Sequence, residues 1–200
     1  MKKILTTLTL LFATIYLFAQ CKPDQVSKDR ITKEEIKVWG LEIVKVSLAE
    51  KLINDQNTTF PSIEAMIGTF GNKYVIRFNL IIVEKSKEKA YYASHKEGNE
   101  NSEILIGFKE GGQPLTLKVS EATNEQKVNK DGSFMTVIAL SCNFDKEGII
   151  KLKEILTGKT IDGIRCKLAG NKNMEGTVRE KKGEKLKEKF TCFYEFISKQ

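Results

Sequence analysis

The sequence predicts an α+β protein: a largely antiparallel β-meander sheet, followed by a C-terminal strand-helix-strand-helix module that packs its helices on one face. Three observations favour this class. Short runs of apolar and polar residues alternate at period two, loops containing Gly or Pro separate these runs, and two late segments carry apolar residues at helical spacing. The elements follow in chain order.

The first 19 residues resemble an export signal. Lys2 and Lys3 precede an uncharged apolar run over residues 4–19, which is shorter than the roughly 20 residues of a membrane-spanning helix. We therefore expect residues 1–19 to be a signal peptide, residues 20–34 a polar leader, and residues 35–200 a single α+β domain. No transmembrane segment is expected after signal cleavage.

The end of the signal, LFAQC, leaves two outcomes open. Bacterial lipoprotein signals resemble a pattern in which a small residue precedes an acylated cysteine, but here Gln20 precedes Cys21. Ala19 is a small residue suited to cleavage before Gln20, which is the outcome we favour. The protein is then periplasmic or extracellular, and a lipid anchor through Cys21 is the alternative.

The first half of the mature chain favours strands. Residues 36–46 are rich in β-branched types and predict a strand, and Ser47 with Glu50 has the spacing of a capping box that begins a short helix to about Asp55. Later strands alternate clearly, and EGGQP joins two of them as a hairpin. Their core faces are predicted to be Tyr74, Ile76, Phe78, Leu80 and Ile82, then Ile104, Ile106 and Phe108, then Leu115, Leu117 and Val119.

The C-terminal third combines strands and helices. A helix is expected from about Asp145 to Gly158, and a terminal amphipathic helix carries one apolar stripe. The strands on either side of the first helix place Ile138, Leu140, Cys142 and Phe144 on one face, and Ile164, Cys166 and Leu168 on another; the stripe of the last helix is Leu186, Phe190, Phe193 and Ile197.

All four cysteines lie in the exported part of the chain, where disulfides form. If the strand-helix-strand unit makes a right-handed crossover, its strands run parallel, and Cys142 and Cys166 lie at similar depth on one face. We therefore expect a disulfide between these two, which leaves Cys192 for Cys21 or free. The alternative is that Cys142, Cys166 and Cys192 are small core residues.

The chain combines a β-meander that contains FKEGGQPLTL, then IDGIRCKL, then a terminal helix with KKGEKLKEKFTCF, and the signal ends in FAQ. In these features the chain resembles uncharacterised exported, β-rich proteins of the Bacteroidota, over about its last hundred residues. The resemblance implies a fold and an address outside the cytoplasm. It implies no activity and no functional residues.

Composition and motifs argue against several functions. The net charge of +7 falls to +5 without the signal, and only four of the 33 basic residues are arginine, so nucleic acid is not an expected partner. Spacings typical of zinc, cofactor or nucleophile sites do not occur, and we expect no cofactor. The single histidine, His95, lies in a polar loop, and Asp131-Gly132 indicates a turn rather than a calcium loop.

The sequence therefore favours a non-catalytic binding or structural module of the envelope, whose partner is an unidentified envelope protein. Trp39, Tyr91 and Tyr92 are candidates for a ligand surface, with sheet packing as the alternative. A second hypothesis is a periplasmic carrier of an apolar ligand such as lipid, held beneath Phe190 and Phe193. A third is an envelope hydrolase that uses His95 or a pair of carboxylates.

Overall fold

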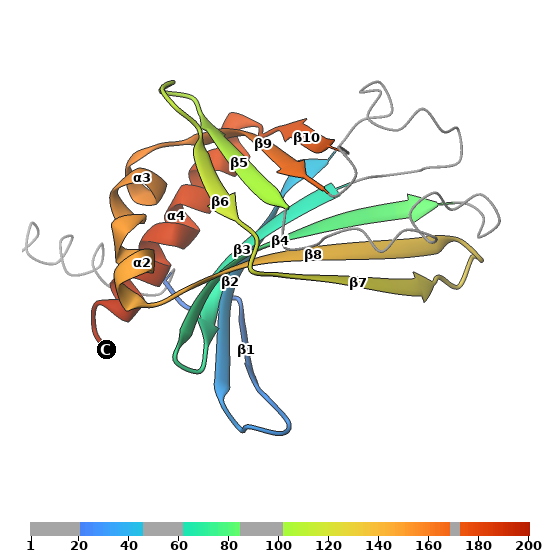
Figure 1. Ribbon diagram of the computed structural model, residues 1–200, viewed down its shortest axis with the longest axis horizontal. Helices are drawn as coiled ribbons and strands as arrows, with labels where there is room; N and C mark the ends of the chain where they lie inside the picture. Colours follow the sequence, from blue (N-terminus) through green and yellow to red (C-terminus); the bar gives the residue numbers. More distant parts are fainter. Residues whose placement is uncertain (1–20, 46–61, 85–101, 169–172) are drawn as a thin grey trace, which may run out of the picture.

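The computed structural model describes residues 21–45, 62–84, 102–168 and 173–200, which form two antiparallel sheets and three helices (Figure 1). The predicted α+β class is confirmed. The first sheet has six strands in the order β1-β2-β3-β4-β8-β7, and the second has four in the order β10-β9-β5-β6. The strands β4, β7 and β8 extend past the four-stranded sheet as a long ribbon in Figure 1.

The elements have the following bounds. The six-stranded sheet contains β1 (Gln25–Lys28), β2 (Glu35–Lys45), β3 (Ser62–Phe70), β4 (Lys73–Glu84), β7 (Glu121–Val128) and β8 (Phe134–Phe144). The four-stranded sheet contains β5 (Glu103–Phe108), β6 (Leu115–Lys118), β9 (Ile161–Lys167) and β10 (Asn173–Thr177). The helices are α2 (Lys146–Lys151), α3 (Lys153–Gly158) and α4 (Glu180–Ile197).

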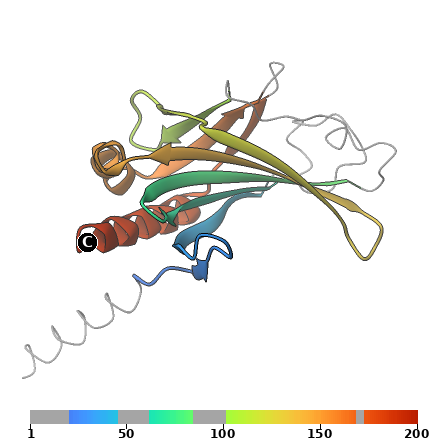
Figure 2. The ribbon, with the colours of Figure 1, turned by 60° about the horizontal axis from the view of Figure 1, so that its bottom comes forward.

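The core lies between the two sheets and the helix α4, which packs against β2, β3 and β9 (Figure 2). Alternation at period two places every second residue of β4 on this inner face, and the predicted residues Ile76, Phe78, Leu80 and Ile82 are fully buried. The predicted stripe of α4 is also buried, with Phe190 and Phe193 fully so. The core faces of the long strands and of the last helix are thus confirmed.

The segment between β8 and β9 differs from the predicted topology. The helix begins at the predicted cap, where the Asp145 side chain accepts a hydrogen bond from the backbone N–H of Gly148, and it divides at Leu152 into α2 and α3. The chain then enters the other sheet, where β9 pairs antiparallel with β5 and β10. The predicted parallel neighbours β8 and β9 are therefore in different sheets.

This topology also corrects the predicted disulfide. Cys142 on β8 and Cys166 on β9 face the shared core from opposite sheets, and both are free thiols. The disulfide instead joins Cys21 to Cys192, whose Cα atoms lie 4.7 Å apart. The Glu195 carboxylate lies 3.5 Å from Cys21 Sγ, a contact without a hydrogen bond because a bonded sulfur carries no proton.

The residues predicted as a polar leader form part of the sheet. The strand β1 pairs with β2, and the Asp24 side chain accepts a hydrogen bond from the N–H of Gly40 at 2.8 Å and forms an ion pair with Lys189 of α4. Together with the Cys21–Cys192 disulfide, these contacts hold the start of the described chain against the last helix. A strand of four residues is too short to show the period-two alternation from which the longer strands are predicted.

A close approach of α4 to β9 positions this helix. A Cβ atom on Gly183 would lie 2.2 Å from the backbone oxygen of Ile161, so only glycine allows the helix to sit this near the strand. The helix then covers the inner face of β2 and β3, while the four-stranded sheet covers the rest of the core. The opposite face of the six-stranded sheet has no helix or strand of the described chain packed on it.

Candidate functional site

Trp39 does not belong to an exposed ligand surface, and the structure shows the alternative, in which it packs on one face of a sheet. It lies on the inner face of β2 with no exposed area, and its ring contacts Phe193 and Phe196 of α4 at centroid distances of 5.6 Å and 5.3 Å. Nε1 has no hydrogen-bond acceptor among the described residues. The other two candidates, Tyr91 and Tyr92, lie outside the described residues, as do His95 and the predicted helix at 47–55.

The ring of Phe193 contacts other aromatic rings. Tyr74 and Tyr194 contact its ring edge to face, at centroid distances of 6.2 Å and 5.3 Å. The hydroxyl of Tyr194 donates a hydrogen bond to the backbone oxygen of Ile149 at 2.8 Å, and burial raises the pKa of this phenol. Through these contacts, an aromatic cluster joins α4 to the six-stranded sheet and to α2.

The two free thiols are not nucleophiles at neutral pH. Burial raises the pKa of Cys142 to about 12, and burial together with the nearby Cys142 raises the pKa of Cys166 above its ordinary value. A nucleophilic cysteine reacts as its thiolate and needs a lowered pKa. Both side chains have no exposed area, so they act as small apolar core residues.

The turn between β7 and β8 confirms the interpretation of Asp131-Gly132. Gly132 has a positive φ of 80°, and the Asp131 carboxylate accepts hydrogen bonds from the hydroxyl and the N–H of Ser133, which lower its pKa. The polar oxygens are thus engaged within the turn. Across the described chain, no group of three or more His, Cys, Asp or Glu side chains is placed to hold a metal ion.

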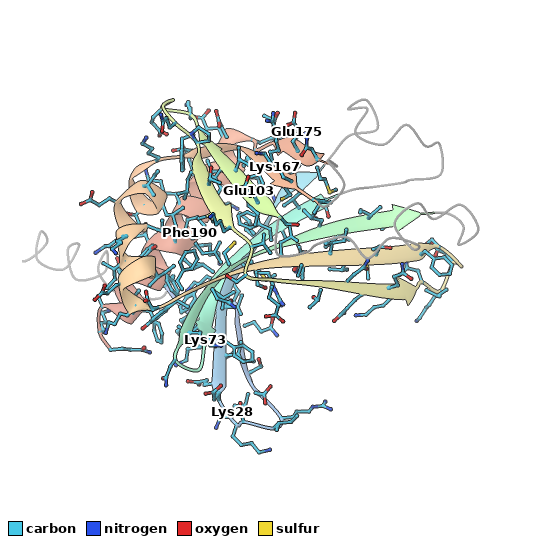
Figure 3. The ribbon with its side chains drawn as sticks, in the orientation of Figure 1. Lys28, Lys73, Glu103, Lys167, Glu175 and Phe190 are labelled. Atoms are coloured by element: carbon cyan, nitrogen blue, oxygen red, sulfur yellow. A yellow bond between two sulfur atoms is a disulfide. The ribbon has the colours of Figure 1, made fainter. Side chains whose placement is uncertain are left out.

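The outward face of the four-stranded sheet is mostly polar, and it carries two ion pairs. Glu103 of β5 forms an ion pair with Lys167 of β9 at 3.2 Å, and Arg165 of β9 pairs with Glu175 of β10. Figure 3 shows Glu103, Lys167 and Glu175 close together over this sheet, while Phe190 lies inside the molecule. These are exposed pairs of the kind that contribute little to stability, and they describe a solvated surface.

The outward face of the six-stranded sheet, called the outer face below, has a different character. Its residues alternate with the buried ones along β2, β3, β4 and β8, and the ladder register shows which of them lie side by side. Two apolar groups lie at its two ends. The first apolar group is Ile36, Val38, Phe70 and Val75, and the second is Ile81, Val83, Met135 and Val137.

Every member of these two groups retains exposed surface, and Phe70 is 41% exposed. The registers place Gly68 between Val75 and Val38, Ile36 beside Phe70, and Ile81 beside Val137, so each group extends across neighbouring strands. Single exposed apolar residues are ordinary, whereas contiguous ones rimmed by polar residues mark a site of interaction. The outer face is therefore the strongest candidate for a functional surface.

Arg77 of β4 lies between the two apolar groups. It is half-buried, and its Nε–H donates a hydrogen bond to Ser141 Oγ of β8 at 3.0 Å. Among the described residues, Ser141 is its only hydrogen-bond acceptor and no carboxylate lies within 4 Å of it. The guanidinium thus keeps donors that a partner can use in a bidentate contact.

Carboxylates lie near Arg77 without pairing to it. Glu64 of β3 stands in the next row along the sheet, opposite Glu42 of β2, and accepts a hydrogen bond from Asn79 Nδ2 at 3.3 Å. Two like charges in directly opposite positions are unfavourable in an isolated sheet. Among the described residues, the centre of the outer face therefore carries a cation without a carboxylate partner beside an anion without a cationic partner.

The sequence analysis missed this surface because it assigned the apolar residues of each strand to the core face alone. The signal was nonetheless present in YVIRFNLIIVE, where Val75, Ile81 and Val83 occupy the positions that a solvated face fills with polar residues. A strand that is apolar on both faces at its ends is expected to be covered on both faces.

Comparison with known proteins finds no family model, no curated protein and no solved structure that matches this chain. Within the part of the chain that the structure describes, no helix has both the length and the apolar character needed to cross a membrane.

Proposed function

We propose that this chain is an exported, non-catalytic interaction module, and that the outer face of its six-stranded sheet binds another protein. The observation that carries the proposal is the contrast between the two outward sheet faces. The four-stranded sheet presents two ion pairs to solvent, whereas the six-stranded sheet presents two apolar groups around Arg77, which has no carboxylate partner among the described residues. Apolar surface with one central arginine is typical of the centre of a protein interface.

The Cys21–Cys192 disulfide supports a protein that is exported and not lipid-anchored. Disulfides persist in oxidising compartments, and acylation would attach lipid to the same sulfur atom of Cys21 that the disulfide uses. The two modifications exclude each other. The bond thus favours signal cleavage before Gln20 over cleavage before Cys21.

The hypotheses of an apolar-ligand carrier and of an envelope hydrolase gain no comparable support from the described residues. The rings of Trp39, Tyr74 and Tyr194 each contact the ring of Phe193, and His95, on which one form of the hydrolase hypothesis depends, lies outside the described residues. The proposal of a binding module therefore takes precedence.

Photo-cross-linking from the native host tests the binding surface. A photoreactive amino acid at Val137, in the second apolar group, should give a covalent adduct with another protein chain. The matched control is Thr116, which is exposed on the outward face of the four-stranded sheet and should give none. Loss of the adduct when Arg77→Glu is added would support the proposal, and failure to cross-link from Val137 would refute it.

The mass of the protein isolated from its host tests export and the state of Cys21. We expect a chain that begins at Gln20, with two cysteines alkylated in denaturant before reduction and four afterwards. A chain that begins at Cys21 and carries acyl groups would contradict this part of the proposal, while leaving the binding surface to be tested separately.

A further inference from the structure

We infer that the occupant of the outer face is a second copy of this chain, bound face to face about a two-fold axis. The inference rests on the proposed function, because it names the partner of the same surface. Its basis is that the outer face is complementary to itself, both in its apolar groups and in its charges.

The arrangement of the apolar groups fits a two-fold interface. The first apolar group lies at the end of β4 near Val75, the second lies at the end near Val83, and Arg77 stands between them. A two-fold axis that lies between two stacked sheets, oblique to the strands, and passes over β4 between Arg77 and Asn79 places the first group of each copy opposite the second group of the other. Two-fold interfaces use one surface patch twice, and sheets stack face to face at about −30°.

The charges follow the same symmetry. The axis places Arg77 of each copy against the row of the other copy that holds Glu64 and Asn79. Arg77 has no carboxylate partner within its own chain among the described residues, and Glu64 has only the amide of Asn79. Two symmetric Arg77–Glu64 contacts would therefore pair the charges that each chain leaves unpaired, and would separate Glu64 from the influence of Glu42.

The sheet is large enough for such an interface. The six strands hold 4, 11, 9, 12, 8 and 11 residues, and with a rise of about 3.4 Å per residue and about 4.8 Å between strands they give a projected area of about 900 Å². A standard interface buries about 800 Å² on each partner. Contact over the four central strands alone thus comes close to the standard size.

Charge reversal on the purified full mature chain tests the inference. We expect the wild-type protein to be dimeric by light scattering coupled to size exclusion, and Arg77→Glu and Glu64→Arg each to weaken the dimer about 100-fold. Mixing the two single variants should restore a dimer, because each then supplies the charge that the other needs. Arg165→Glu, the same reversal on the four-stranded sheet, should leave the mass unchanged.

Each outcome decides the question, since circular dichroism first confirms that every variant is folded. A dimer lost in both single variants and regained on mixing supports the inference. The inference is overturned if the wild-type protein is monomeric, or if its dimer is equally stable in the wild type and in both charge-reversal variants. If the chain is monomeric but Val137 still cross-links to a different protein in the host, only this inference fails; if Val137 gives no adduct of either kind, the proposed function fails with it.

Discussion

The disulfide between Cys21 and Cys192 should contribute strongly to stability, and its removal by Cys21→Ala with Cys192→Ala is a direct test. The bond closes a loop of 171 residues. The chain-entropy relation gives about 5 kcal/mol for a loop of this length. Disulfides often deliver less than this limit, so we expect the free energy of unfolding to fall by about 2–4 kcal/mol, and Tm by about 10 °C.

Part of the N-terminal attachment should survive the substitution. Asp24 N–H donates to Val38 O at 2.8 Å, and its carboxylate contacts both Gly40 and Lys189. We therefore expect β1 to stay paired in the native state of the double variant, with faster amide exchange. The effect on global stability should come mainly from the unfolded chain, which gains freedom when its two ends separate.

Urea denaturation followed by tryptophan fluorescence measures the effect. Reductant should destabilise the wild type by the same amount as the two substitutions, and it should leave the double variant unchanged. A loss below about 0.5 kcal/mol, within the range of ordinary surface substitutions, would refute the reasoning. An equal response to reductant in the wild type and the double variant would refute the assignment of the bond.

Four further predictions concern the core. Gly183→Ala should destabilise the protein by about 1–3 kcal/mol, because the added Cβ would lie 2.2 Å from a backbone oxygen of β9, even though alanine is the better helix former. As a control, substitution of the exposed neighbour, Glu184→Ala, should change stability by less than about 0.5 kcal/mol in the same denaturation assay. Burial raises the pKa of the Cys142 thiol to about 12 in the folded protein, whereas in the unfolded chain it is about 9. Between about pH 9 and pH 12 the unfolded chain therefore loses this proton while the folded protein keeps it, so the free energy of unfolding should fall over that range. The fall should be less steep in Cys142→Ala. Disulfide reagents should label Cys142 and Cys166 only after unfolding, and native labelling would contradict their burial. The fluorescence of Trp39, the single tryptophan, should resist iodide quenching in the native protein and lose this resistance in urea. Strong quenching in the native protein would contradict the burial of Trp39.

The sequence predicts the long strands and the last helix well because their side chains alternate between two environments. In β4 every second residue is apolar and buried, and in α4 the apolar stripe recurs at helical spacing. The same reasoning fails for β7, whose sequence EATNEQKV lies at the sheet edge with nearly every side chain exposed. A strand without a buried face leaves no alternating signal, so β7 and the short β1 and β10 could not be recognised.

Local sequence patterns could not predict features that depend on contacts between distant parts of the chain. Whether β9 returns beside β8 or enters the other sheet depends on packing across the whole core, and the error in that step produced the error in the disulfide. The proposed binding surface could be predicted only in part from the sequence. Val75, Ile81 and Val83 signalled it locally, but the role of Arg77 required the strand register, since its neighbours Ser141 and Glu64 are distant in sequence.

The measurement that tests the central claim most directly is oxidation of methionine by hydrogen peroxide in cells of the native host. Met66 and Met135 lie on the outer face, and Met174 is buried in the core as an internal control. If the outer face is covered by a bound protein, Met66 and Met135 should oxidise much more slowly in the wild type than in Arg77→Glu, while Met174 stays protected in both. Equal oxidation of Met66 and Met135 in the two proteins would contradict the claim that this face binds.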